Sequence, residues 1–154
     1  MLSDDVYRTK LAATFAGLLR AVTPLGDVAE ISHVETPDYM RLWLLPYAQG
    51  ACPVEIMLRS DQHYDIEVGQ EFYEDCEIKR FDIFAPLIEA IARGDVIQRH
   101  HVSSATGTER SIETIVTLAG GEVWHKGHVH PDLARSIAEQ STVFEDRRFV
   151  AYRR

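Results

Sequence analysis

The sequence has no long apolar run and contains little cysteine. Its richest hydrophobic stretch, Leu42-Trp43-Leu44-Leu45, ends at Pro46, far short of the roughly 18 apolar residues that a membrane-spanning helix needs. Cys52 and Cys76 are the only cysteines, and the first residues are acidic, the reverse of a secretory signal. We therefore expect reduced thiols and a cytoplasmic protein with no membrane partner.

Signatures of catalysis and of phosphate binding are also missing. No serine lies in a G-x-S-x-G elbow, and no glycine-rich loop has the spacing of a P-loop or a dinucleotide site. His101 and Ser103 share a face of one predicted strand, but no acid has an evident position to orient the histidine. The acids of residues 65–77 do not follow the order of an EF-hand loop. We expect no cofactor, and a non-enzymatic role is favoured over a catalytic one.

Positive charge is missing from one stretch of the chain. Between Asp61 and Ile78 there are seven acidic side chains and neither Lys nor Arg, so this stretch carries nearly all of the formal net charge of −8. Clustered charge of one sign attracts a partner of the opposite sign. Nucleic acids require clustered Lys and Arg. The charge pattern therefore predicts a basic protein partner and no nucleic acid.

Apolar spacing predicts a long first helix over residues 4–22. Asp4 and Asp5 lie where the positive end of the helix dipole favours acids, and Pro24 and Gly26 end the pattern. Apolar residues recur at intervals of three and four, which places them on one buried stripe. The stripe consists of Tyr7, Leu11, Phe15, Leu18 and Val22.

A second helix is predicted over residues 81–94. Pro86 falls in its first turn, where a missing N–H matters least, and Gly94 ends it. Its apolar stripe is Phe84, Leu87, Ile88 and Ile91. A short third helix is predicted to begin at Pro131, with Leu133 and Ile137 facing inward.

Period-two alternation predicts a hairpin from residues 54–59 and 63–68. Opposed residues of a hairpin share a face, so apolar residues must oppose apolar residues. The pairs that satisfy this are Leu58 with Tyr64, Ile56 with Ile66, and Val54 with Val68. The connecting loop, residues 60–62, then has an odd length. The same register places Glu55 opposite Glu67, so the outer face of the hairpin is acidic.

The preceding predicted strand, residues 40–47, is apolar at both odd and even positions. Such a strand is covered on both faces or buried at an interface. We therefore expect Trp43 and Leu45 to lie in the interface of a homodimer.

Two glycines predict a later hairpin turn. Gly120 and Gly121 both tolerate positive φ, as a two-residue turn requires. That turn would place Leu118 opposite Val123 and Thr117 opposite Trp124.

The order of the predicted elements is a helix, four strands, a helix, three strands and a helix. Sequential hairpins imply an α+β fold with one antiparallel sheet of about six to seven strands and two or three helices packed mainly on one face. No linker or repeat divides residues 1–154, which we expect to form a single domain. Residues 145–154 form either a final edge strand or a flexible tail.

Histidines supply the strongest chemical hint in the sequence. Neutral imidazole is a common ligand for zinc, nickel and copper, and an extended H-x-H presents both rings on one side. The spacing matches no standard zinc motif. The candidate metal ligands are His100, His101, His125, His128 and His130.

We expect a binding module that docks its basic partner on the acidic hairpin face. The partner-binding candidates are Glu55, Asp65, Glu67, Glu71, Glu74 and Asp75. The element order is similar to that of type III secretion chaperones, which are small, acidic dimers, and the charge resembles that of immunity proteins that neutralise basic toxins; the chain shares no motif with either. Two alternatives stay open: a metal-assisted or acid–base enzyme that uses the histidines, and a small-ligand carrier with a pocket between the sheet and the first helix.

Overall fold

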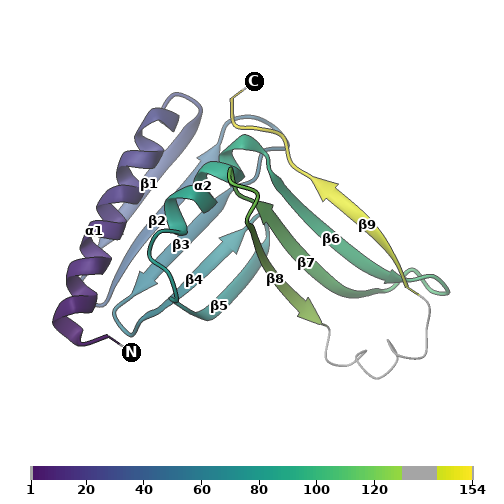
Figure 1. Ribbon diagram of the computed structural model, residues 1–154. Coiled ribbons are helices and arrows are strands. Elements are labelled where there is room, and N and C mark those ends of the chain that lie inside the picture. The colour runs from purple at the N-terminus through teal and green to yellow at the C-terminus, as the bar shows by residue number, and fades with distance from the viewer. Residues whose placement is uncertain (1, 130–141, 154) are drawn as a thin grey trace.

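Figure 1 shows a computed structural model of the chain, which describes residues 2–129 and 142–153. The described residues form two α-helices and nine strands, with a short 3-10 helix, Thr23–Leu25, after the first helix. The helices are α1 (Asp4–Val22) and α2 (Phe84–Arg93). The strands are β1 (Ala29–Glu35), β2 (Tyr39–Pro46), β3 (Val54–Arg59), β4 (His63–Val68), β5 (Glu71–Glu77), β6 (Val96–Ser103), β7 (Glu109–Thr117), β8 (Val123–Val129) and β9 (Thr142–Arg148).

The α+β class with antiparallel pairing is confirmed, but the strands form two sheets and not one. The first sheet has the order β1-β2-β3-β4-β5, and the second has the order β8-β7-β6-β9. Both helices lie in front of the five-stranded sheet in Figure 1. No described helix is long and apolar enough to cross a membrane.

The predicted helical stripes are confirmed. The buried residues of α1 are the five that the spacing selects, from Tyr7 to Val22. In α2, Phe84, Leu87, Ile88 and Ile91 are buried against the same core. Gly94 ends α2 at a φ of 85°, the left-handed conformation that the C-terminal position of a helix favours.

The predicted register of the β3–β4 hairpin is also confirmed. Leu58 pairs with Tyr64 and Ile56 with Ile66, and all four side chains are buried. Glu55 lies directly opposite Glu67 on the other face. The hydrophobic pattern decided this register, because a shift of one residue would turn the apolar side chains toward solvent.

Strand β2 is covered by the core on one face only. Leu42 and Leu44 are fully buried, whereas Trp43 is half-buried and Leu45 is 47% exposed. The expectation that the chain itself covers both faces is therefore wrong within the described residues. Burial of the odd-numbered face at an interface stays a prediction.

The predicted register at the last hairpin turn is wrong by one residue. Trp124 pairs with Val116, and Thr117 pairs with Val123. Trp124 and Val116 are both buried, so this register keeps the indole in the core. The Leu118 N–H donates to the carbonyl oxygen of Glu122, so the turn has three residues, and of its two glycines only Gly121 has a positive φ, 88°.

Strand β5 escaped the sequence analysis, and β9 begins three residues before the edge strand expected within residues 145–154. In β5, the alternation breaks at a bulge between Tyr73, which pairs with Ile66, and Cys76, which pairs with Tyr64. Asp75 lies in this bulge and has a φ of 56°. A bulge removes the strict period of two by which a strand is recognised. Strand β9 pairs with β6 along its whole length, and its side chains are mostly exposed. The third helix predicted from Pro131 lies outside the described residues.

A buried polar network joins the two sheets. The side-chain amide of Gln98 in β6 donates to the carbonyl oxygen of Val68 in β4 at 2.7 Å and to the hydroxyl of Thr114 at 3.3 Å. The Thr114 hydroxyl lies 2.7 Å from the hydroxyl of Tyr73 in β5. Residues of both sheets and both helices also belong to one hydrophobic cluster. The sheets therefore share a core.

The end of the chain is anchored on this core. Phe149 and Tyr152 are buried, and the Tyr152 N–H donates to the carbonyl of Ala92 at the end of α2. A Cβ at Gly94 would lie 2.9 Å from the backbone nitrogen of Ala151, so only glycine leaves room for this crossing. Of the two expected forms of residues 145–154, the described part is an edge strand followed by a packed segment.

Candidate functional site

The outer face of the five-stranded sheet, turned away from the helices, carries opposed carboxylates at its centre. Glu55 in β3 faces Glu67 in β4, and like charges in this position destabilise a sheet. Arg41 forms an ion pair with Glu55. No described residue forms an ion pair with Glu67.

At the tip of the same face, one arginine is shared by three acids. Arg59 forms ion pairs with Asp61, Asp65 and Asp75. The backbone N–H of Asp75 also donates to Asp65 at 2.9 Å. These acids therefore fold around an internal cation, and their attraction for an external cation is reduced.

The remaining two partner-binding candidates lie in β5, apart from the central pair. Glu74 is exposed next to the bulge. Glu71 lies opposite Val68, whose side chain is buried, and thus on the other face of the sheet. The six predicted acids therefore do not form one uniform patch.

Trp43 and Leu45 lie beside the central acids. Trp43 pairs directly with Glu55, and the Arg41 guanidinium lies 4.9 Å from the centre of the Trp43 ring. A shallow pocket of about 180 Å³ is lined by Trp43, Leu45 and Pro53 together with Glu55 and Glu67. The structure thus joins two predicted sites, the acidic face and the apolar strand, into one surface.

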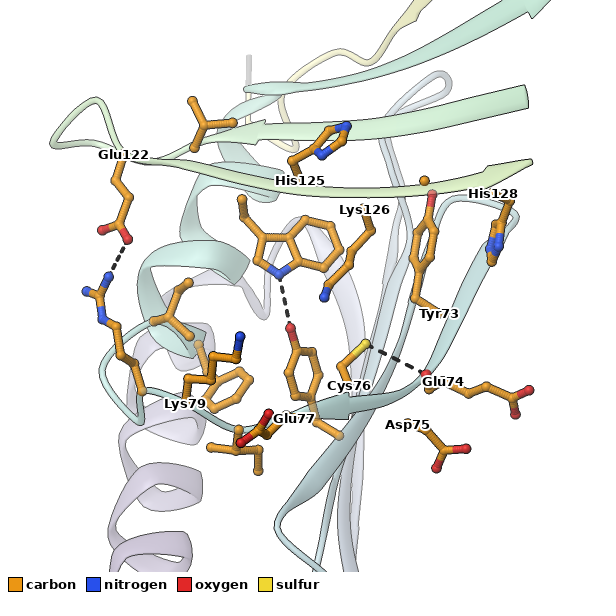
Figure 2. A pocket seen from close by; sticks show the side chains of 18 residues that line it. Tyr73, Glu74, Asp75, Cys76, Glu77, Lys79, Glu122, His125, Lys126 and His128 are labelled. Atoms are coloured by element: carbon orange, nitrogen blue, oxygen red, sulfur yellow. Dashed lines mark hydrogen bonds and ion pairs between the residues drawn. The ribbon is translucent and has the colours of Figure 1, made fainter. Parts of the chain in front are cut away.

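A larger cleft of about 620 Å³ lies between β5 and β8, where the two sheets diverge (Figure 2). The indole N–H of Trp124 donates to the hydroxyl of Tyr64 at 3.1 Å, and both side chains are buried. At one end, the rings of Tyr73 and His128 stack with centroids 4.5 Å apart. His128 Nε2 also lies 2.7 Å from the carbonyl oxygen of Phe72. The cleft therefore has a packed aromatic wall.

Charged groups and one thiol line the rest of this cleft. Lys79 and Lys126 extend their ammonium groups into it from opposite sides (Figure 2). Arg80 at the rim forms an ion pair with Glu122. Burial raises the pKa of the Cys76 thiol, although the charge of Lys126 acts in the opposite direction. Cys76 is therefore a protonated thiol at neutral pH.

The predicted carrier pocket between the sheet and α1 is filled by side chains. Tyr7, Phe15 and Leu18 of α1 are buried there with exposures of 1% or less. Burial raises the pKa of Tyr7 to about 12. An open cleft lies instead between β5 and β8.

The predicted histidine ligands are divided between the two faces of the four-stranded sheet. On the face turned away from the other sheet, His101 and His125 lie 2.6 and 2.8 Å from the two carboxylate oxygens of Glu113. Their hydrogen bonds lower the pKa of Glu113. On the opposite face, His100 contacts Glu109 at 3.2 Å and His128 stacks on Tyr73.

The described residues contain no group of three or more His, Cys, Asp or Glu side chains that could hold a metal ion. His130 lies outside the described residues. His101 and His125 each direct Nε2 at one oxygen of the Glu113 carboxylate.

The sequence analysis missed the cleft residues Lys79, Lys126 and Tyr73. One available signal was the alternation of Trp124, Lys126 and His128, which places these three side chains on one face of β8. Lys79 lies in the loop after β5, and no local pattern connects it with Lys126.

Comparisons with known proteins supply no relative on which to base a function. No protein-family model, no curated protein and no solved structure matches this chain.

Proposed function

We propose that this protein is a binding module that captures a basic segment of a partner protein on the outer face of its five-stranded sheet. The observation that carries the proposal is the direct opposition of Glu55 and Glu67 beside the half-buried Trp43. Only one of these two carboxylates has an ion-pair partner among the described residues. The sheet thus keeps an unfavourable pair that an external cation would relieve.

The chemistry of this surface suits an arginine or lysine side chain. A guanidinium or ammonium placed between Glu55 and Glu67 would form charge-assisted hydrogen bonds, which are stronger than neutral ones. The aliphatic stem of the same side chain would pack on Trp43 and Leu45, which line the same pocket. Unpaired negative charge would also speed the encounter with a basic partner.

The substitution Glu67→Lys tests this proposal. Binding of a fluorescent arginine-rich peptide, measured by anisotropy at low salt, should weaken at least about tenfold, because the change reverses a charge at the centre of the surface. The same change should raise the free energy of unfolding by about 0.5 kcal/mol, because it replaces a like-charge pair with an opposite-charge pair. Loss of binding with a gain in stability could not be attributed to misfolding.

Glu89→Lys is the matched control for this experiment. Glu89 is exposed on α2, and its substitution changes the net charge by the same amount. We expect it to weaken peptide binding less than about twofold. Equal losses in the two variants would show that only net charge matters, and the proposed surface would be wrong.

A homodimer through Trp43 and Leu45 is a second proposal for the same surface. Leu45 and the neighbouring Tyr47 are exposed at 47% and 67%, so both side chains are available to a second copy. In a two-fold contact the Glu67 side chains of both copies would be brought close to the interface. Dimerisation and capture of a basic partner would therefore respond to salt in opposite directions.

A further inference from the structure

We propose that the cleft between β5 and β8 binds a small organic anion, an aromatic or other planar molecule that carries a carboxylate or phosphate group. This site is separate from the proposed protein-binding surface and does not depend on it. The cleft volume of about 620 Å³ falls within the range of roughly 300–1,000 Å³ that is usual for small-molecule sites.

Two lysines of the cleft are suited to bind the anionic group of a ligand. Lys126 projects from the inner face of β8, and Lys79 projects from the loop that follows β5 (Figure 2). Among the residues that the structure describes, neither has an ion-pair partner. Two ammonium groups directed into one cleft make the local potential more positive, and an anion in the cleft would be attracted by both.

Four acids and three bases line the cleft, so its attraction for an anion depends on which of the acids are already paired or directed elsewhere. Glu122 is paired with Arg80, and Asp75 is paired with Arg59. Glu74 points away from the cleft in Figure 2. Glu77 is the acid that stays near Lys79 without an ion-pair partner in the described chain. The cleft therefore favours an anion, and Glu77 limits its affinity.

The aromatic and apolar wall of the cleft is suited to pack against an apolar group of the ligand. Trp124 and Tyr64 are held by their hydrogen bond, and Ile83 and Phe84 also line the space. The Tyr73–His128 stack closes one end. A flat ring can pack on this wall while its acidic group lies between the two ammonium groups.

Phenyl phosphate is a suitable probe, and fluorescence of Trp124 reports its binding. The Trp43→Phe chain leaves Trp124 as the single tryptophan. We expect saturable quenching by phenyl phosphate, weaker binding of inorganic phosphate and no binding of benzylamine. Equal binding of benzylamine, or no saturable phenyl phosphate binding up to millimolar concentrations, would overturn the proposal.

Variants of the two lysines locate the site. Lys79→Gln with Lys126→Gln should raise the Kd for phenyl phosphate at least about tenfold, because two charge-assisted contacts are lost. Lys126→Arg should retain binding, and Glu77→Gln should tighten it about two- to threefold. Arg20→Gln, on the exposed side of α1, is the control for the loss of one positive charge. If the double variant binds like its parent, the anion site is wrong.

Stability and partner binding separate this proposal from the previous one. Neither Lys79 nor Lys126 contributes an ion pair to the described fold, so the double variant should unfold at the parent's denaturant midpoint. Glu67→Lys should leave the affinity for phenyl phosphate unchanged, because Glu67 lies on the outer face of the five-stranded sheet, opposite the face of Tyr64 and Tyr73 that lines the cleft. A parallel loss of phenyl phosphate binding in Glu67→Lys would count against two independent sites.

Discussion

The outward faces of the two sheets differ in how their charges are paired. On the four-stranded sheet, Arg99 contacts both oxygens of Asp146 at 2.8 and 3.1 Å, and Glu113 accepts hydrogen bonds from two histidines. On the five-stranded sheet, Glu67 faces another carboxylate, Glu55. On the four-stranded sheet these carboxylates are paired internally, whereas Glu67 on the five-stranded sheet has no ion-pair partner among the described residues.

This difference shows why net charge alone is a poor guide to a binding surface. The acidic run of residues 61–78 contains Asp61, Asp65 and Asp75, which the structure places around one arginine, Arg59. Glu67 belongs to the same run but has no ion-pair partner among the described residues, and it faces Glu55, which lies outside the run. Pairing across strands, not density along the chain, decides where an external cation is attracted.

The largest expected effect tests whether the two sheets are one cooperative body. Gln98→Ala removes the partner of the buried Val68 carbonyl and of the Thr114 hydroxyl, and should lower the free energy of unfolding by about 2 to 3 kcal/mol. In variants that retain a single tryptophan, the fluorescence of Trp43 reports on unfolding of the five-stranded sheet and that of Trp124 on unfolding of the four-stranded sheet. Both unfolding transitions in urea should shift together.

The exposed Gln70 supplies the control, since Gln70→Ala should change stability by less than about 0.5 kcal/mol. If Gln98→Ala shifted the Trp124 transition and not the Trp43 transition, the sheets would be separate units. The two outward faces would then belong to separately folding units.

A smaller effect should distinguish the carboxylates of the two faces. Glu113→Gln should lower the free energy of unfolding by about 1 kcal/mol at pH 7, because it weakens two hydrogen bonds to a charged, partly exposed group. Glu67→Gln should leave stability unchanged or raise it slightly, because it removes a like-charge opposition. Chemical denaturation measures the change in the free energy of unfolding in each variant. A loss of stability in both variants would contradict the proposed difference between the two faces.

The pH dependence of Glu113 follows from the direction of its pKa shift. Hydrogen bonds from His101 and His125 hold this pKa below the ordinary value. The stabilisation is therefore complete above the ordinary carboxyl pKa, and it is lost as the pH falls through the folded-state pKa. The stability difference between the parent chain and Glu113→Gln should shrink in acid, and a difference that grew in acid would contradict this assignment.

The smallest expected effect concerns self-association. If copies dimerise through Trp43 and Leu45, raising the salt from about 20 to 300 mM should strengthen the dimer a few fold by screening acidic repulsion. Light scattering measures this change, and anisotropy of the arginine-rich peptide should show the opposite trend. A dimer that weakens with salt would place the interface elsewhere.

The sequence predicted correctly those helices and strands whose buried residues recur at the regular spacing of the element. The stripe from Tyr7 to Val22 and the pairing of Ile56 with Ile66 follow from repeats of 3.6 and 2 residues. The β8 register was predicted incorrectly because two adjacent glycines allow turns of either two or three residues. Burial of Trp124 then selected the three-residue turn.

The candidate sites were harder to predict from the sequence than the helices and strands. The opposition of Glu55 and Glu67 was predictable, because a hairpin register depends on neighbouring residues. The association of Glu113 with His101 and His125 was not, because three strands must first be placed in register. The cleft requires in addition the relative placement of the two sheets.

The amino-acid sequence by itself determined which residues are buried in α1, α2 and the β3–β4 hairpin, because hydrophobic burial leaves a periodic record along a single segment. It also determined that Glu55 and Glu67 oppose each other. Only the tertiary structure decided that Arg59 forms ion pairs with three acids and that Lys79 and Lys126 converge on one cleft. Electrostatic interactions depend on distance in space, and residues far apart in the chain leave no local pattern that shows how close they lie.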